Sequence, residues 1–226
     1  SISVSDDTAI EPGTNTGEYT FTRTATVYGT YPGDLVVNFA VTGTAISGTD
    51  FNSLGTSITI PDGQATKTLT LSPRDDFIAE DPEGVLVTIS TSAAYSIAAP
   101  GAATVFITDN DPPTITILAT DASASEAGPD PGIFTITRSG AINNPLSVDV
   151  LIGGTATSGV DYTALPNPVV IPAGQLSAVV NLSPLDDLLI EGAETVSLTI
   201  INGGINYTVG NPSTATVTIA DDDLPS

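Results

Sequence analysis

Short runs in which apolar and polar residues alternate recur along the whole chain, and β-branched residues are frequent in them. Examples in the first half are Tyr19–Arg23, Leu35–Val41, Ala65–Ser72, Val85–Ser90 and Ala103–Thr108. An apolar residue at every second position predicts a half-buried strand, and the Gly, Pro, Asp and Asn clusters between the runs predict turns. No segment has a helical apolar period of any length. The pattern predicts about seven strands in each half of the chain, at the spacing of an antiparallel β-sandwich.

The same pattern occurs twice, because the chain is an internal repeat. GTAISGTDF at Gly43–Phe51 returns as GTATSGVDY at Gly154–Tyr162, and GEYTFTR at Gly17–Arg23 returns as GIFTITR at Gly132–Arg138. Two more pairs match, namely LSPRDDFIAEDPEGVLVTI with LSPLDDLLIEGAETVSLTI and ATVFITDND with ATVTIADDD. We expect two domains that fold separately, residues 1–111 and 114–226, joined by Pro112-Pro113. The abrupt start without Met and the joint-like residues after Asp223 lead us to expect a fragment of a longer repeat protein.

The charge of the chain limits the kinds of molecule that it can bind. The 226 residues include 26 acids, only 4 Lys and Arg, no His and no Cys, which gives a formal net charge of −22. Nucleic acid and anionic membrane surfaces are excluded as partners because the basic footprint that binds phosphate is missing. No stretch approaches the roughly 20 apolar residues of a membrane helix, so no membrane insertion is expected. A metal ion or a positively charged partner fits this composition.

The acidic residues are not scattered, because most of them recur at matched positions where predicted strands end. In the first repeat they are Glu11, Asp50, Asp75, Asp76, Glu80, Glu83, Asp109 and Asp111. In the second repeat they are Glu126, Asp161, Asp186, Asp187, Glu191, Glu194, Asp221, Asp222 and Asp223. In an antiparallel sandwich these strand ends can meet at one pole. Without counterions such a cluster would destabilise the fold and raise several carboxylate pKa values.

A hard divalent cation would resolve this repulsion. Ca²⁺ takes six to eight oxygen ligands in flexible geometry, whereas Mg²⁺ keeps most of its waters. Zn²⁺ prefers His and Cys ligands, and the chain has neither. Eight or nine carboxylates exceed what one ion needs, so we expect roughly two to four Ca²⁺ ions per domain, sharing bridging carboxylates.

Four elements of each repeat together resemble the Calx-β domain family, which is named for sodium–calcium exchangers and also occurs in large bacterial surface proteins. The elements are an early Glu, the GTA.SG.D[FY] block, the DD...E..E block before an apolar strand, and the terminal acidic triplet. The resemblance implies a seven-stranded immunoglobulin-like sandwich with several Ca²⁺ ions at one end, bound by the recurrent acids. The backbone carbonyls of Ile78 and Leu189 are weaker candidate ligands. Asn110 stands where the second repeat has Asp222, so the first repeat is expected to hold one ion more weakly.

Other interpretations of these residues are simpler. Asp50 and Asp161 also fit as turn caps, with Phe51 and Tyr162 as core residues beneath the turns. Asp6 and Asp7, which have only Asp121 as a loose match in the second repeat, are interpreted as surface residues. An enzyme is not expected, since a Ser–His or Cys–His nucleophile is impossible without His or Cys. A glycosidase pair such as Asp76 and Glu80 would need an aromatic sugar cleft, and the chain has no Trp.

The sequence therefore favours a non-catalytic, calcium-binding structural or adhesive tandem module of an extracellular or cell-surface repeat protein. Its expected partners are calcium ions, neighbouring repeats and a cell-surface or matrix ligand. Calcium would stabilise each sandwich and stiffen the joint, because Asp109–Asp111 directly precede Pro112. The first alternative is a calcium-sensing pair that regulates an attached domain. The second is a carbohydrate- or protein-binding module.

Overall fold

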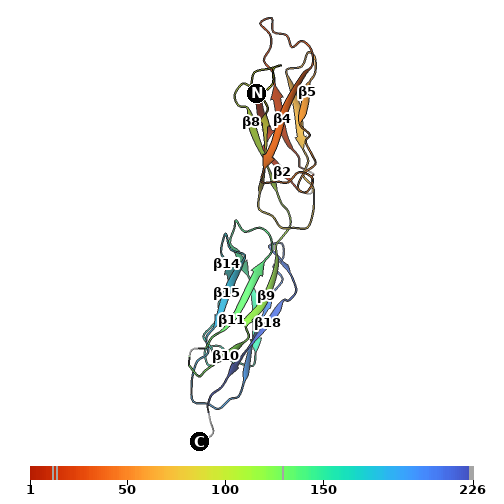
Figure 1. The fold of residues 1–226 in the computed structure, drawn as a ribbon. Coiled ribbons are helices and arrows are strands. Elements are labelled where there is room, and N and C mark those ends of the chain that lie inside the picture. Colours follow the sequence, from red (N-terminus) through yellow and green to blue (C-terminus); the bar gives the residue numbers. More distant parts are fainter. Residues whose placement is uncertain (12, 14, 129, 224–226) are drawn as a thin grey trace. The chain divides into compact units, whose positions relative to one another are not determined.

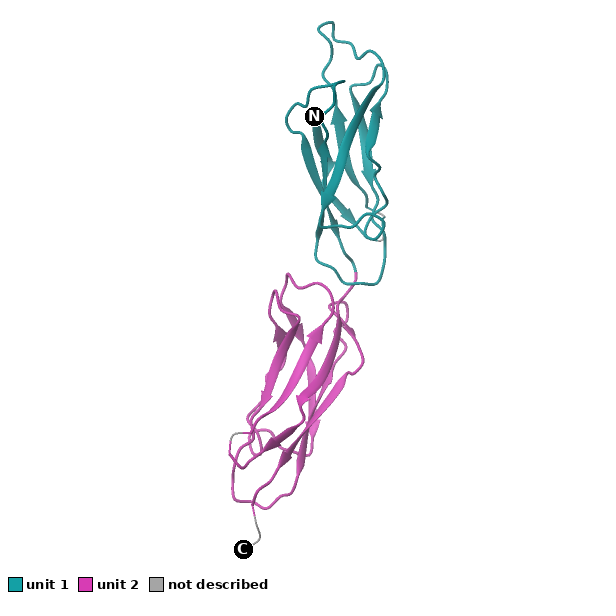
Figure 2. Ribbon diagram, viewed as in Figure 1, with its two compact units in different colours: residues 1–110 teal, residues 111–226 magenta. Residues whose placement is uncertain are grey.

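The computed structural model describes residues 1–11, 13, 15–128 and 130–223, which form strands and connecting loops (Figure 1). The chain divides into two compact units, residues 1–110 and 111–226 (Figure 2). Each unit has its own hydrophobic core. Within the described ranges, no helix has the length and hydropathy needed to cross a membrane.

Unit 1 is a sandwich of a three-stranded sheet, in the order β1-β3-β6, and a five-stranded sheet, in the order β2-β8-β7-β4-β5. Its described strands are β1 (Ile2–Asp6), β2 (Thr8–Ile10), β3 (Gly17–Thr22), β4 (Leu35–Gly43), β5 (Ser57–Ile60), β6 (Thr66–Leu71), β7 (Glu83–Ile89) and β8 (Ala102–Thr108). Neighbours pair antiparallel except β2 and β8, which run parallel. The all-β immunoglobulin-like prediction is confirmed, with the first of its seven strands divided between the two sheets.

Unit 2 repeats this plan with sheets in the orders β15-β11-β9-β17 and β10-β18-β16-β13, and with the short pair β12-β14. Its described strands are β9 (Thr114–Asp121), β10 (Ser123–Ser125), β11 (Gly132–Arg138), β12 (Leu146–Val148), β13 (Val150–Gly154), β14 (Val169–Ile171), β15 (Ser177–Leu182), β16 (Glu194–Ile200), β17 (Thr208–Val209) and β18 (Thr214–Ala220). The parallel pairs are β10 with β18 and β17 with β9. The segment equivalent to β4 is interrupted at Asp149, which separates β12 from β13.

The division of the first strand has a local cause in both units. The Oδ1 atom of Asp6 accepts a hydrogen bond of 3.3 Å from the backbone amide of Thr8, and the Oδ1 atom of Asp121 accepts one of 3.2 Å from that of Ser123. An Asp side chain that bonds the amide two residues on stabilises a bend. Asp6 and Asp121 are thus more than surface residues, because they fix the point where the chain passes from one sheet to the other.

Alternating side chains of the two sheets fill the core of each unit. In β18 every second residue is buried, and β7 and β11 alternate in the same way. The rings of Phe21 and Phe39 lie 5.5 Å apart, within the range of favourable aromatic pairs. Phe51 and Tyr162 are buried, as predicted for residues beneath the SGTD and SGVD turns. Burial of these apolar faces is the main stabilising term of each sandwich.

The glycine that opens each GTA block is required by a close backbone approach. Gly43 and Gly154 have φ values of 141° and 118°, a region that L side chains rarely adopt. A Cβ atom at Gly43 would meet the carbonyl oxygen of Gly84 in β7, and one at Gly154 would meet that of Thr195 in β16. The chain can therefore leave the strand next to β7 or β16 and enter the turn that carries Asp50 or Asp161.

The Arg that ends both the GEYTFTR and the GIFTITR segment binds loop carbonyls at the other end of each sandwich. Arg138 is buried, and its guanidinium donates hydrogen bonds of 2.7–3.2 Å to four backbone carbonyls, those of Ile142, Asn144, Pro172 and Gln175. Arg23 does the same in unit 1, with the carbonyls of Tyr31, Gly33, Pro61 and Gln64 at 2.7–2.9 Å. Two of the few cations thus tie loops together, at the end opposite to the acidic residues.

Candidate metal centres

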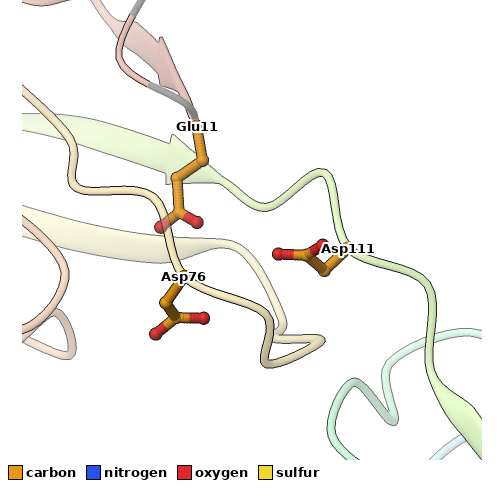
Figure 3. A group of neighbouring side chains, drawn as sticks. All are labelled: Glu11, Asp76 and Asp111. Atoms are coloured by element: carbon orange, nitrogen blue, oxygen red, sulfur yellow. The ribbon is translucent and has the colours of Figure 1, made fainter.

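In unit 1 the predicted acidic residues meet at one end, because the segments that carry them all finish there. Glu11 follows β2, Asp50 lies in the turn after β4, and Asp76 lies in the loop between β6 and β7. Figure 3 shows the side chains of Glu11, Asp76 and Asp111 near one another, with Asp111 directed toward the other two. A carboxylate oxygen of each residue lies within 4.8 Å of those of the others. Asp111 is the first residue after the boundary of unit 1, and it completes a group of potential metal ligands with Glu11 and Asp76.

A second group lies beside it and consists of Asp50, Glu80 and Glu83, whose carboxylate oxygens are also within 4.8 Å of one another. The two groups act on each other electrostatically, since the charge of Glu11 contributes to the raised pKa of Glu83, and that of Asp76 to the raised pKa of Glu80. The acidic end of unit 1 is therefore one continuous cluster with two ligand groups.

Unit 2 contains the counterpart of the second group, formed by Asp161, Glu191 and Glu194 at the same spacing. The counterparts of the first group are Glu126, Asp187 and Asp223. They do not form such a trio in the described part of unit 2, although the charge of Asp187 contributes to the raised pKa of both Glu126 and Asp223. The acids gather in both units, and they are drawn together more closely in unit 1.

Backbone hydrogen bonds hold the two turn aspartates in place. The Oδ2 atom of Asp50 accepts a bond of 2.5 Å from the amide of Ile46, and the Oδ2 atom of Asp161 accepts one of 2.5 Å from the amide of Thr157. Both residues are only 5% exposed. Each carboxylate therefore uses one oxygen to cap its own turn, and the other remains available to the cluster. The turn-cap interpretation and the ligand interpretation are compatible.

Two other acids, Asp109 and Asp221, position the loops that precede β7 and β16. The Oδ2 atom of Asp109 accepts a bond of 2.7 Å from the amide of Glu80, and the Oδ2 atom of Asp221 accepts bonds of 2.9 and 3.0 Å from the amides of Glu191 and Gly192. These backbone bonds lower the pKa of Asp221. Asp109 and Asp221 thus anchor the loops that bring Glu80 and Glu191 into their groups, a role that sequence analysis did not distinguish from direct ligation.

The remaining predicted ligands are Asp75, Ile78, Asn110, Asp186, Leu189 and Asp222. The amides of Ile78 and Leu189 donate to Asp76 at 2.7 Å and Asp187 at 2.6 Å, so these residues lie at the cluster while their side chains stay exposed. The charges of Asp186 and Asp222 contribute to the raised pKa of Asp223. Asp75 lies in the loop between β6 and β7, and Asn110 lies after β8. Neither is part of a trio among the described residues. Ligation by each of these residues stays a prediction.

Burial and repulsion together raise the pKa values of the clustered glutamates. The pKa of Glu83 rises to about 7, first because of burial and then because of its contact with Asp50 and the charges of Asp50, Glu80 and Glu11. The pKa of Glu194 is raised by burial and by Asp161 in the same way. The Oε2 atoms of Glu83 and Glu194 are buried and have no hydrogen-bond partner among the described residues. A buried carboxylate oxygen without a partner is costly, and a bound cation would compensate it.

The donor set decides which cation would fit. All potential ligands are carboxylate, amide or backbone oxygens, and the chain offers neither imidazole nor thiolate. Such donors suit a hard divalent cation, and flexible loop ligands in large number suit Ca²⁺ better than Mg²⁺. The residues present therefore fit calcium.

Several solved structures are similar to the chain. Among solved structures, the chain is similar to the calcium binding domain CBD12 of CALX1.1, at 19% identity and a TM-score of 0.42, over 96% of this chain and 99% of that one. It is also similar to the apo-form Calx CBD1 domain, at 22% identity and a TM-score of 0.42, over 50% of this chain and 100% of that one. A third similar structure is the Escherichia coli adhesin FdeC, at 18% identity and a TM-score of 0.40, over 97% of this chain and 63% of that one. No match is found among curated proteins.

A family model settles the relationship. The model described as the Calx-beta domain matches residues 6–111 and again residues 109–223, which is nearly all of the chain. The first match contains the acidic cluster of unit 1 and its strands from β2 to β8, and the second contains all the described strands of unit 2 and its acidic cluster. The chain is a tandem pair of domains that belongs to the Calx-beta family.

Proposed function

We propose that the chain is a non-catalytic calcium-binding module in which Ca²⁺ stabilises each sandwich by neutralising its acidic end. The observation that carries the proposal is the pair of matching trios, Asp50–Glu80–Glu83 and Asp161–Glu191–Glu194. Each contains a buried aspartate and a glutamate whose Oε2 atom is buried without a hydrogen-bond partner among the described residues. The same trio occurs at matched positions in both domains, which a solvated acidic surface would not require.

Calcium would act on the fold by joining segments that are far apart in sequence. The groups of unit 1 draw their members from the end of β2, the turn after β4, the loop before β7 and the residues after β8. Repulsion among these carboxylates opposes their approach, and a shared cation reverses the sign of that interaction. Two adjacent groups support more than one ion in unit 1, within the two to four per domain inferred from the sequence.

The wider role in the parent protein is part of the proposal. We place the chain in an extracellular or cell-surface repeat protein with a structural or adhesive role, where millimolar calcium would keep the sites filled. Its further partners would be neighbouring repeats and a cell-surface or matrix ligand. Binding at Asp109 and Asp111, directly before Pro112-Pro113, would stiffen the joint. A regulatory calcium sensor is the alternative, and it requires affinities near micromolar.

Calcium titration by calorimetry, with elemental analysis of the purified protein, tests the proposal. We expect saturable binding of several ions per chain, much weaker binding of Mg²⁺, and a loss of sites in the double variant Glu83→Gln, Glu194→Gln. A matched control is Glu18→Gln, which removes one charge in β3 outside the described trios. The absence of calcium binding to the native chain would overturn the proposal. Dissociation constants near micromolar would favour the sensor over the structural role.

A further inference from the structure

The first residues of β9 in unit 2 are held on both sides. On one side Ile115 pairs with Arg138 of β11, and on the other it pairs with Val209 of β17. The amide of Gly210 donates a bond of 2.8 Å to the carbonyl of Ile115, and the amide of Thr208 donates one of 2.9 Å to that of Pro113. The side chain of Ile115 is fully buried in the core. The start of β9 is thus a central strand segment that completes this end of the sandwich.

The matching position in unit 1 can be located from equivalent contacts. Ile2 pairs with Phe21 and donates a bond of 3.0 Å to the carbonyl of Pro100, and Ile117 pairs with Ile136 and donates one of 3.0 Å to that of Pro212. Ile2 therefore corresponds to Ile117, and Ser1 corresponds to Thr116. The place that Ile115 takes in unit 2 lies directly ahead of Ser1 in unit 1.

Unit 1 contains a counterpart of the segment that pairs with Ile115 in unit 2. The hydroxyl of Tyr95 accepts a bond of 3.1 Å from the amide of Asn38, as that of Tyr207 does at 3.1 Å from the amide of Asp149. Ser96–Ala98 thus correspond to Thr208–Gly210, which include β17. No strand of the described part of unit 1 pairs with Ser96 and Ile97.

A cavity of about 240 Å³ lies at this place in unit 1. Its lining combines the aliphatic side chains of Leu35, Val37, Ile60 and Ile97 with polar residues that include Ser1 and Arg23. An apolar cavity of about 150 Å³ already accepts a molecule the size of benzene, so a branched aliphatic side chain fits here. The contrast in burial agrees, because Arg138 and Tyr207 are buried under β9, whereas Arg23 and Tyr95 are only half-buried.

We propose that this cavity is a strand-acceptor site, which receives an extended segment that continues β1 on its amino-terminal side and seats a branched aliphatic residue directly before Ser1. The amides of Ser96 and Ala98 would donate to its carbonyls, as those of Thr208 and Gly210 do in unit 2. The other edge of the segment would face β3 at Arg23. The site adds a β-strand connection to unit 1 that is independent of the acidic end.

The site also selects the residue before the aliphatic one. A Cβ atom at Gly210 would lie only 2.7 Å from the Cγ2 atom of Thr114, and unit 1 has Ala98 at the position of Gly210. The segment received by unit 1 must therefore carry a small residue, such as Ala or Ser, at the position of Thr114. Ser1 already has no γ-methyl group at the position of Thr116, where the same Cβ atom would lie 2.8 Å from the Cγ2 atom.

The test uses the full chain with Ala-Ile placed directly before Ser1, and a matched chain with Ala-Asp there. We expect Ala-Ile to slow hydrogen exchange of the Ser96 and Ala98 amides by about tenfold or more and to raise the unfolding temperature of unit 1, in calcium and in chelator alike. Ala-Asp should do neither, because burying an unpaired carboxylate opposes docking. Equal exchange rates in the two chains would overturn the proposal. So would equal protection of the unextended chain by a free Ala-Ala-Ile peptide, which would assign the site to a separate partner.

Discussion

The carboxyl groups of Asp50 and Glu83 lie against each other at the acidic end of unit 1, and their contact helps raise the pKa of Glu83 to about 7. Asp161 and Glu194 repeat the relationship in unit 2. Two acids placed together, with one oxygen buried and lacking a hydrogen-bond partner, oppose folding unless a proton or a cation lies between them. The predictions about calcium follow from this pair.

Glu83→Gln should separate two effects of the Glu83 charge, which are its repulsion of Asp50 and its attraction of calcium. The substitution keeps the shape of the side chain and removes the repulsion with Asp50, so the domain without calcium should unfold at a higher temperature than the native protein. Calcium affinity should fall by at least about tenfold, since even outer-shell changes around a metal cost that much. Thermal unfolding in chelator and calorimetric titration measure the two effects, and Glu18→Gln is the control. A lower unfolding temperature in chelator would contradict the repulsion argument.

Stability in chelator should depend on pH with a definite sign. The pKa of Glu83 is about 7 in the fold against an ordinary value of 4.5, and the pKa of Glu194 is raised too. Between these values the folded state holds a proton that the unfolded chain has lost, so stability should fall as pH rises from about 5 to about 7.5. Saturating calcium should remove or reverse this slope. Urea unfolding across that range measures it, and rising stability with pH in chelator would refute the assignment.

The two arginines that bind loop carbonyls, Arg23 and Arg138, should contribute to the stability of the fold and not to calcium affinity. Arg138→Ala leaves four carbonyls without their donor at the end opposite to the acids, and bonds to charged groups contribute about 1.5–3 kcal/mol each. We expect a loss of unfolding free energy of at least about 3 kcal/mol for unit 2, with the calcium affinity of folded unit 2 unchanged. Denaturant unfolding and calorimetry of the same variant measure the two quantities. Weaker calcium binding to folded unit 2 would show that the two ends of the sandwich are coupled.

The joint offers a comparison between equivalent positions. Asp109→Asn with Asp111→Asn should make the chain more flexible in calcium, because these residues directly precede Pro112-Pro113, which restrict the next dihedral angles. The matching pair, Asp221→Asn with Asp223→Asn, should not, since it does not precede that joint. Small-angle scattering of both double variants gives the answer. Equal flexibility would show that calcium does not act on the joint.

The repeats, the strand-rich fold and the clustering of the acids were predictable from sequence, because they depend on periodicity and on matched positions. Two features were not. Asp6 and Asp121 divide the first strand between two sheets, and the partner β8 or β18 that makes this favourable lies about a whole domain away in sequence. Asp109 and Asp221 look like the other acids in sequence, yet their backbone bonds to Glu80 and Glu191 make them loop anchors. Such non-local partners leave no local pattern.

Thermal unfolding of the native chain in chelator, in excess Ca²⁺ and in excess Mg²⁺ tests the central claim most directly. A ligand that binds only the folded state stabilises it by mass action, about 2.7 kcal/mol at a hundredfold excess over its dissociation constant. The account predicts a marked fall in unfolding temperature in chelator, full recovery in Ca²⁺ and a smaller recovery at equal Mg²⁺. Superimposable unfolding curves in all three conditions would contradict it.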